Sequence, residues 1–160
     1  MVGWAELEAA EPELAAAGRA LLCQESGVAI GFLATVSQQG VPHLAPVCPI
    51  FCEEGLCLSV GAATPKRRDL DTTGRYVLHA FLGPRDAEFR VSGLAERLDA
   101  VEVRRRVHSA IPFAAFGVDD PIYRLRVAEC LYVYWENVGQ PGTRPVRRGW
   151  RAPGYGGPVL

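Results

Sequence analysis

The sequence has no apolar run long enough to cross a membrane. Its longest such run, Val28–Val36, is less than half of the ~20 residues that a transmembrane helix needs. A signal-peptide pattern is also missing, because glutamates stand where a basic segment and an apolar stretch would be found. These glutamates are Glu6, Glu8, Glu11 and Glu13. We therefore expect a cytoplasmic protein with no membrane partner.

An excess of charge of one sign is absent as well. The formal net charge is -1 at pH 7, which gives the chain no general attraction to nucleic acid or to anionic lipid. The basic patch that most invites a nucleic-acid interpretation lies near the C-terminus, and no basic domain stands behind it. It consists of Arg144, Arg147, Arg148 and Arg151. We expect no nucleic-acid partner.

Cysteine is scarce and odd in number, with five residues that sit inside apolar segments. In a chain without an export signal, this pattern is typical of free buried thiols. The spacing of Cys48, Cys52 and Cys57 is that of neither a zinc site nor a redox C-x-x-C pair, so we expect no metal. A turn allows Cys52 and Cys57 to face each other, although free thiols remain the preferred interpretation.

The residues that are present predict one mainly β domain of 160 residues and 17.3 kDa. Short apolar runs separated by Gly, Pro, Asn and Asp turns are typical of antiparallel strands, and a set of six closes into a small barrel. We expect a helical segment over 1–26, the barrel domain over 27–136 and a Gly/Pro/Arg-rich tail over 137–160. The predicted strands are Val28–Val36, Val41–Phe51, Leu56–Val60, Tyr76–Leu82, Glu88–Leu98 and Tyr123–Trp135, with helices over Pro12–Gln24, over Thr64–Leu70 and after Asp99.

Ser59–Leu70 is the segment that best indicates chemistry. A strand leads to Thr64, which can cap a helix that begins at Pro65. The first turn then carries Lys66, the single lysine of the chain, where a cation is unfavourable for the helix itself. An anion such as a phosphate would explain this placement, because a helix start offers free N–H groups. A solvated helix with ordinary surface charges is the alternative.

Four segments in the same order and spacing resemble a known family. They are Gly31–Val36 with its turn to Gly40, Pro42–Val47, Leu56–Val60 with Thr64–Leu70, and Glu88–Glu96. Together they resemble the pyridoxamine 5′-phosphate oxidase-like family of flavin-binding split β-barrels, over roughly 20–135 of the chain. The fold that this resemblance implies is a six-stranded antiparallel split β-barrel with a few helices.

The resemblance also implies a homodimer with two cofactor sites at the subunit interface. The backbone of the second strand would lie along the isoalloxazine ring, and the end of the third strand with the following helix start would take the phosphate. Ring contacts would come from Pro46, Val47, Cys48 and Pro49, and phosphate contacts from Ser59, Val60, Thr64, Lys66 and Arg67. Trp135, Trp150 or Tyr155 of the partner chain could cover the ring, although core packing is the preferred role of Trp135.

The leading functional prediction is an FMN-dependent oxidoreductase acting on a small-molecule substrate. No catalytic residue is named, because the cofactor carries the hydride chemistry. The segment Trp150–Pro153 is only a partial match to the Arg-Leu-x-Pro ending of true pyridoxamine 5′-phosphate oxidases, so the vitamin B6 reaction is not assigned. A deazaflavin (coenzyme F-420) reductase and a non-enzymatic flavin- or haem-binding protein are the alternatives. For haem, the candidate ligands are His43, His79 and His108, each of which is more simply a hydrogen-bonded structural histidine.

Overall fold

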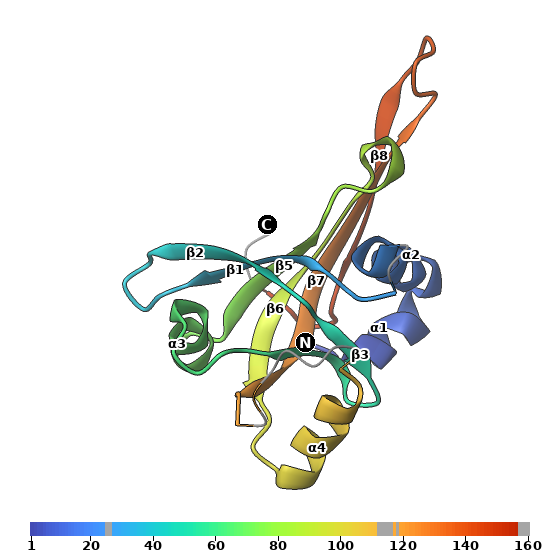
Figure 1. Cartoon of the computed structure of the whole chain (residues 1–160). Coiled ribbons are helices and arrows are strands. Elements are labelled where there is room, and N and C mark those ends of the chain that lie inside the picture. Colours follow the sequence, from blue (N-terminus) through green and yellow to red (C-terminus); the bar gives the residue numbers. More distant parts are fainter. Residues whose placement is uncertain (25–26, 112–116, 118, 157–160) are drawn as a thin grey trace.

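The computed structural model describes residues 1–24, 27–111, 117 and 119–156 (Figure 1). Its strands form one curled antiparallel sheet in the order β2-β1-β5-β6-β7-β4-β3, and β8 pairs with β7. The helices are α1 (Trp4–Ala10), α2 (Pro12–Cys23), α3 (Pro65–Thr72) and α4 (Val101–Ser109), with a 3-10 turn at Pro84–Asp86. The strands are β1 (Gly31–Val36), β2 (Pro42–Val47), β3 (Ile50–Cys52), β4 (Gly55–Ser59), β5 (Arg75–Ala80), β6 (Glu88–Arg97), β7 (Ile122–Glu136) and β8 (Arg144–Arg151).

The predicted second strand is divided into two in the structure. β2 ends at Val47 and β3 begins at Ile50, so Cys48 and Pro49 connect them. Proline has no N–H for a ladder and restricts the residue before it, which explains the break. β2 then pairs with β1, whereas β3 pairs with β4 at the other end of the sheet order. This crossing from one end to the other gives the split barrel, as predicted.

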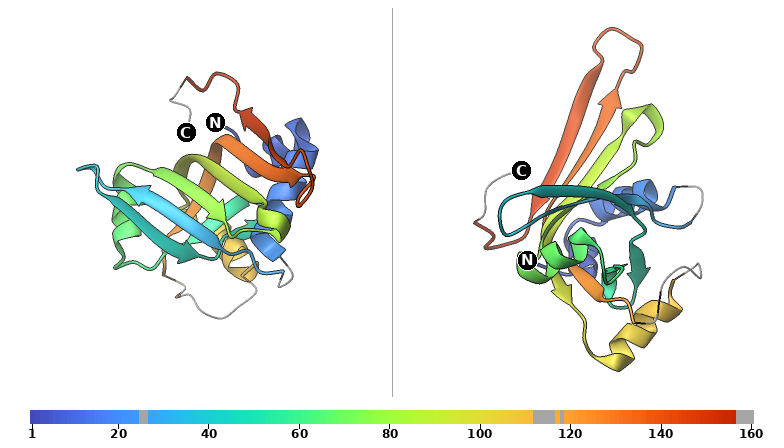
Figure 2. Two further views of the ribbon diagram at one scale, coloured as in Figure 1. Left: turned by 90° about the horizontal axis from the view of Figure 1, so that it is seen from above. Right: turned by 60° about the vertical axis from the view of Figure 1, so that its left-hand side comes forward.

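The strand count differs from the prediction, because the sheet has eight strands rather than six. One addition is the division of the second strand, and the other is β8 in the segment that was expected to be a tail. β8 pairs with β7 from Glu129↔Arg151 to Glu136↔Arg144. Its sequence, RPVRRGWR, lacks the apolar alternation of a half-buried strand, since most of its residues are exposed at an edge. The hairpin of β7 and β8 extends away from the rest of the molecule (Figure 2).

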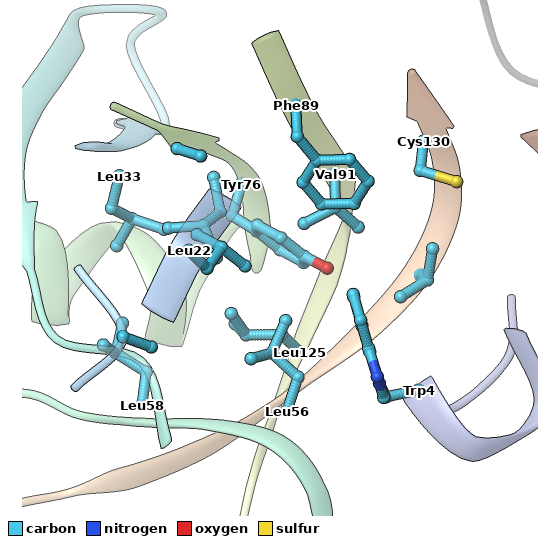
Figure 3. Packing of buried hydrophobic residues seen from close by; sticks show 14 of the residues in the cluster. Trp4, Leu22, Leu33, Leu56, Leu58, Tyr76, Phe89, Val91, Leu125 and Cys130 are labelled. Carbon is cyan, nitrogen blue, oxygen red and sulfur yellow. The ribbon is translucent and has the colours of Figure 1, made fainter. Parts of the chain in front are cut away.

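The core lies between the inner face of the sheet and the two N-terminal helices (Figure 3). Phe89 on β6 is fully buried, and its ring lies over Gly18 of α2, where an added Cβ would be 2.3 Å from Phe89 Cζ. Trp4 of α1 makes an edge contact with the same ring, at 6.3 Å between centroids. These contacts hold the helices against β6 and leave the other face of the sheet open. No helix in the described part of the chain is both long and apolar enough to span a membrane.

A bulge bends β7 where it passes β6. The pairing changes from Ser92↔Glu129 to Gly93↔Val127, so Ala128 is the extra residue. Gly93 is required here, because a Cβ at this position would lie 1.9 Å from the carbonyl oxygen of Arg126. Bulges increase the twist of a strand pair, which helps this sheet to curl into a barrel.

Candidate functional site

The junction of β4 and α3 is the place where the sequence predicts an anion site. Thr64 caps the helix: its Oγ1 accepts from Arg67 N at 3.4 Å and donates to the Gly61 carbonyl at 2.9 Å. Pro65 is the first helical residue. The helix therefore starts as the sequence predicted, with N–H groups of its first turn lacking intrahelical acceptors.

Ser59, the last residue of β4, holds an unsatisfied polar atom at this junction. The residue is 4% exposed, and its Oγ has no hydrogen-bond partner within the described part of the chain. The next residue, Val60, is fully buried and donates its N–H to the Pro121 carbonyl at 3.0 Å. A buried hydroxyl without a partner is rare in native proteins, and a ligand oxygen would satisfy it.

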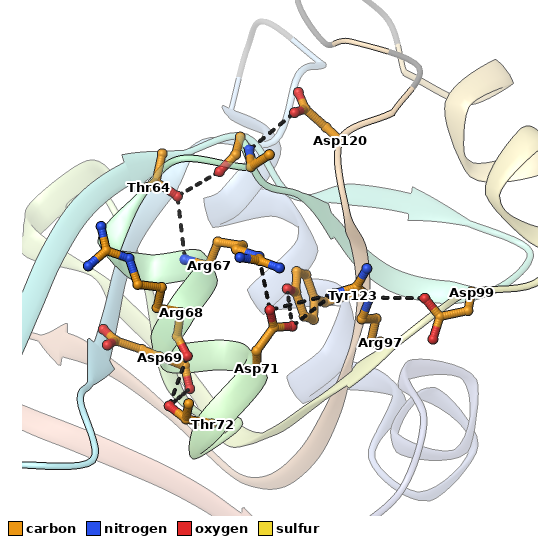
Figure 4. Close-up of polar contacts among 12 residues, drawn as sticks. Thr64, Arg67, Arg68, Asp69, Asp71, Thr72, Arg97, Asp99, Asp120 and Tyr123 are labelled. Atoms are coloured by element: carbon orange, nitrogen blue, oxygen red, sulfur yellow. Dashed lines mark hydrogen bonds and ion pairs between the residues drawn. The ribbon is translucent and has the colours of Figure 1, made fainter.

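The three basic residues of the first turn, Lys66, Arg67 and Arg68, differ in their surroundings, and Figure 4 shows the two arginines. Arg67 Nε lies 2.9 Å from Asp71 Oδ2, so its guanidinium is directed along the helix toward its C-terminal end. Lys66 is half-buried and Arg68 is exposed, and neither forms an ion pair with any described residue. Lys66 thus carries the positive charge in this turn that is both half-buried and uncompensated.

Asp71 joins α3 to two strands. Tyr123 of β7 donates its hydroxyl proton to Asp71 Oδ1 at 2.7 Å, and Arg97 of β6 donates to the same oxygen at 3.2 Å. Burial acts to raise the pKa of Asp71, but these two hydrogen bonds and the charge of Arg67 outweigh it and hold the pKa below its usual value. Because Arg67 already forms an ion pair with Asp71, its guanidinium is less available to an anion than the ammonium group of Lys66.

One acidic group lies beside the loop that leads to Thr64. Asp120 Oδ1 accepts from Ala62 N at 3.3 Å, and its Oδ2 accepts from Gly117 N at 3.2 Å. This carboxylate takes a backbone N–H that a phosphate could otherwise use. An anion at the junction would therefore depend on Ser59, Thr64 and Lys66.

The residues predicted to lie along a flavin ring occupy the end of β2 and its connection to β3. Pro46 is exposed, Val47 and Pro49 are buried, and Cys48 is half-buried. Ile50, the residue after Pro49, pairs with Cys57, which lies two residues before Ser59 on β4. The connection therefore joins β3 at the half of β4 that leads to Ser59.

The sheet has an exposed apolar surface opposite the core, which we call the outer face. In one row Phe32 lies between Pro46 and His79, and in the next Ala34 lies between Leu44 and Val77. Directly paired residues project to the same side of a sheet. Phe32 is 39% and Leu44 69% exposed, and the Phe32 ring packs edge-on against Phe81 with centroids 4.8 Å apart.

The outer face continues over β6, β7 and β8 as a pocket of about 490 Å³ that is lined by both charged and apolar residues. Glu129 Oε1 forms an ion pair with Arg151 Nη2 at 2.6 Å on one side of it. Gly149 lies between two arginines of β8 that project to the same side, so the floor of the pocket has no side chain there. Residues that line the pocket are Arg90, Ser92, Glu129, Cys130, Leu131, Arg147, Gly149, Trp150 and Arg151.

Two of the three histidines have one ring nitrogen fixed by an oxygen. His43 Nδ1 lies 2.7 Å from Asp69 Oδ2, and His79 Nδ1 lies 2.6 Å from the Ala80 carbonyl. A proton on Nδ1 leaves the lone pair of Nε2 available to a ligand. On α4, by contrast, His108 Nε2 is buried and has no hydrogen-bond partner among the described residues. In the described part of the chain no three His, Cys, Asp or Glu side chains are grouped to hold a metal ion.

One assignment made from the sequence changes, and one residue was missed. Trp135 was expected to pack in the core, but it is 38% exposed on the projecting hairpin. The aromatic residues of this hairpin that pack against the core are Tyr132 of β7 and Trp150 of β8. Sequence reasoning also missed Asp69, which is buried in α3 and contacts two strands. Its position within the run Lys66–Asp69 is typical of a solvated helix face, so the sequence held no signal for its role.

Comparison with known proteins identifies the fold. No family model matches the sequence, and no curated protein matches it. Among solved structures, a haem-binding protein from Mycobacterium smegmatis is 22% identical with a TM-score of 0.56, and the match covers 83% of this chain and 57% of that protein. ChuZ from Campylobacter jejuni is 11% identical with a TM-score of 0.62, covering 87% of this chain and 59% of that one.

A third solved structure covers most of its own length. It is a Listeria innocua protein provisionally assigned as a pyridoxamine 5′-phosphate oxidase, 17% identical with a TM-score of 0.56, and the match covers 69% of this chain and 90% of that one. The present chain thus spans less than two thirds of the first two structures. Identities this low establish shared architecture. The curled sheet, the crossing from β2 to β3 and these matches together show that the chain has the pyridoxamine 5′-phosphate oxidase-like split-barrel fold.

Proposed function

We propose that this chain is the protomer of a homodimeric FMN-dependent oxidoreductase, with the cofactor phosphate at the junction of β4 and α3. The observation that carries the proposal is the buried hydroxyl of Ser59, which has no partner among the described residues. This hydroxyl ends the strand that leads to a capped helix start, and the first turn of that helix carries the uncompensated charge of Lys66. A doubly charged phosphate would satisfy the hydroxyl, the N–H groups and the lysine together.

In this proposal the protein supplies position and charge. Ser59 donates to a phosphate oxygen, Lys66 neutralises it, and Thr64 keeps the helix start in place. β2 has one neighbouring strand in the described sheet, so one row of its backbone N–H and C=O groups is free to hold a ring. Bound FMN would supply hydride transfer between a small-molecule substrate and its ring. A deazaflavin cofactor presents a phosphate in the same way and is the alternative within this chemistry.

FMN titration tests the phosphate site. Quenching of FMN fluorescence gives the affinity of the wild type and of Lys66→Ala, and Arg68→Ala is the matched control, since it removes an exposed positive charge two residues later. We expect Lys66→Ala to weaken FMN binding by about 10- to 100-fold, the value of a charge-assisted contact, and Arg68→Ala to change it little. Riboflavin, which lacks the phosphate, should bind both variants and the wild type equally. Equal FMN affinity in Lys66→Ala and wild type would place the phosphate elsewhere.

Turnover separates an enzyme from a carrier. The loaded protein should be reduced by a nicotinamide nucleotide and then pass electrons to an acceptor. Reduced deazaflavin is the second electron donor to be tried. Loading the protein with a deazaflavin in place of FMN tests the alternative cofactor. A loaded protein that neither donor reduces would be a flavin carrier.

A haem-binding role is the second candidate, and His79 favours it. Its Nδ1 is fixed by the Ala80 carbonyl, and the ring projects on the outer face beside Phe32 and Arg90. This arrangement is typical of a histidine whose Nε2 binds a metal. One structure with the same fold is described as a haem-binding protein. Haemin titration tests the role: a Soret band lost in His79→Ala but kept in His108→Ala would support it, and an unchanged band in His79→Ala would contradict it.

A further inference from the structure

The hairpin of β3 and β4 places two thiols in contact. Cys52 Sγ lies 3.9 Å from Cys57 Sγ, and a two-residue turn, Glu53 and Glu54, separates the strands. Ile50 pairs directly with Cys57, and Cys52 pairs with Gly55. Because Ile50 and Cys52 are two residues apart on one strand, both cysteines project to the same side of the hairpin. The contact is therefore fixed by the register.

The two cysteines differ in access to solvent. Cys57 is fully buried within a small cluster that also contains Ile50, Leu98, Val107 and Ile122. Cys52 lies at the edge of this cluster and is partly exposed. A small molecule from solution can thus reach Cys52 first, while Cys57 lies directly behind it.

The electrostatic surroundings increase this difference. The hydrogen bond between the two sulfurs lowers the pKa of Cys52 to about 7, against the effect of partial burial, and a backbone hydrogen bond at Glu54 lowers it further. The same hydrogen bond, together with burial, raises the pKa of Cys57. Burial also raises the pKa of Cys23, of Cys48 and of Cys130. The thiolate, which is the reactive form, is therefore most populated at Cys52 near neutral pH.

We propose that Cys52 and Cys57 form an oxidant-reactive dithiol that a peroxide converts into a disulfide. The Cys52 thiolate attacks one peroxide oxygen, the O–O bond breaks, and Cys52 becomes a sulfenic acid while hydroxide leaves. The thiol of Cys57 then attacks the Cys52 sulfur, an S–S bond forms and water leaves. Two thiols and one hydrogen peroxide thus give one disulfide and two waters. The sulfurs approach from 3.9 Å to about 2.05 Å. The site does not depend on the proposed cofactor.

Peptide mapping of the oxidised protein tests this proposal. The reduced full-length chain is treated with one equivalent of hydrogen peroxide, free thiols are alkylated, and digestion after Glu53 or Glu54 separates the two cysteines. We expect the two peptides to be joined and to be lighter by two hydrogen atoms than the sum of the free peptides. Alkylated Cys52 and Cys57 in separate peptides after oxidation would overturn the proposal.

Variants assign the two roles. Cys52→Ser should slow peroxide consumption by at least about tenfold at pH 7, because it removes the low-pKa thiol. Cys57→Ser should leave a sulfenic acid at Cys52 that dimedone traps, and Cys23→Ser, which removes another half-buried thiol, is the matched control with wild-type behaviour expected. Faster oxidation of Cys48 than of Cys52 would contradict the proposal. Circular dichroism checks that each variant is folded. If one of them is not, the peptide map of the oxidised wild-type protein still decides whether Cys52 and Cys57 form a disulfide.

Discussion

The carboxylate of Asp69 lies 2.7 Å from His43 and joins α3 to the hairpin of β1 and β2. The same Oδ2 accepts the hydroxyl proton of Thr35 at 2.6 Å. Asp69 is 3% exposed, so these contacts replace its hydration. They fix where α3 sits against the sheet, and with it where Lys66 and the helix start point. Asp69 is therefore a positioning residue for the candidate site.

Asp69→Asn should destabilise the fold. The amide keeps the size of the side chain and one oxygen, but it lacks the charge that strengthens the hydrogen bonds of His43 and Thr35 to Oδ2. We expect the free energy of unfolding to fall by about 1–3 kcal/mol, as for a buried polar group that loses a partner. Urea unfolding measures this change. Asp99→Asn is the control, because Asp99 is exposed, and a loss equal to that of Asp69→Asn would show that the buried contacts contribute nothing.

The stability of the fold should also depend on Asp71 at acid pH. Its pKa is held below the usual 3.8, so the carboxylate contributes stability that is fully present above that pH and is lost as the pH falls through the lower folded-state pKa. Asp71→Asn should therefore be less stable than the wild type at pH 7 and closer to it at pH 3 or below. Urea midpoints at both pH values measure the difference. A gap that stays constant or widens on acidification would show that Asp71 does not stabilise the fold through its charged form.

Much of the sheet could be predicted, because most strands carry their pattern locally. Glu88–Arg97 alternates between core and solvent and is bounded by turns, so β6 was found within one residue of its ends. β8 carries no such pattern, since its order comes from pairing with β7. The division of the second strand was signalled by Pro49, but only the position of β4 shows that β3 joins a different neighbour. Local sequence cannot contain that information.

The candidate site was predictable in the same uneven way. The capped start of α3 follows from Thr64 and Pro65, which act on their own helix. Arg67 forms its ion pair with Asp71 one helical turn later. The position of the Asp71 carboxylate in turn depends on hydrogen bonds from Tyr123 and Arg97, which lie on strands distant in the sequence. The unsatisfied hydroxyl of Ser59 is a property of burial, which no motif records. Tertiary packing therefore selects Lys66, among neighbouring basic residues, as the half-buried uncompensated charge.

The bulge at Gly93 gives a prediction about folding. Alanine there would place its Cβ 1.9 Å from the Arg126 carbonyl, which is backbone and cannot move without breaking the pairing of β6 and β7. We expect Gly93→Ala to cost about 1–3 kcal/mol or more in free energy of unfolding. Gly149→Ala on β8 is the control, because its nearest atoms would be 3.7 Å away, at ordinary contact distance. Thermal and urea unfolding compare the two, and equal stability of both variants would show that the bulge tolerates a side chain.

The outer face gives a prediction about assembly. The proposed homodimer needs an apolar surface, and Leu44, at 69% exposed, is the most exposed large apolar side chain of the outer face. A charge placed there would lose hydration on association, so Leu44→Glu should shift the dimer toward monomer by at least about tenfold in Kd. Val101→Glu is the matched control, since Val101 is 65% exposed on α4, away from this face. Light scattering coupled to gel filtration gives the masses. If both variants are dimeric, the interface lies on another surface of the protein. If the wild type is monomeric, the homodimer is not part of the proposed function, and FMN titration alone then tests the phosphate site.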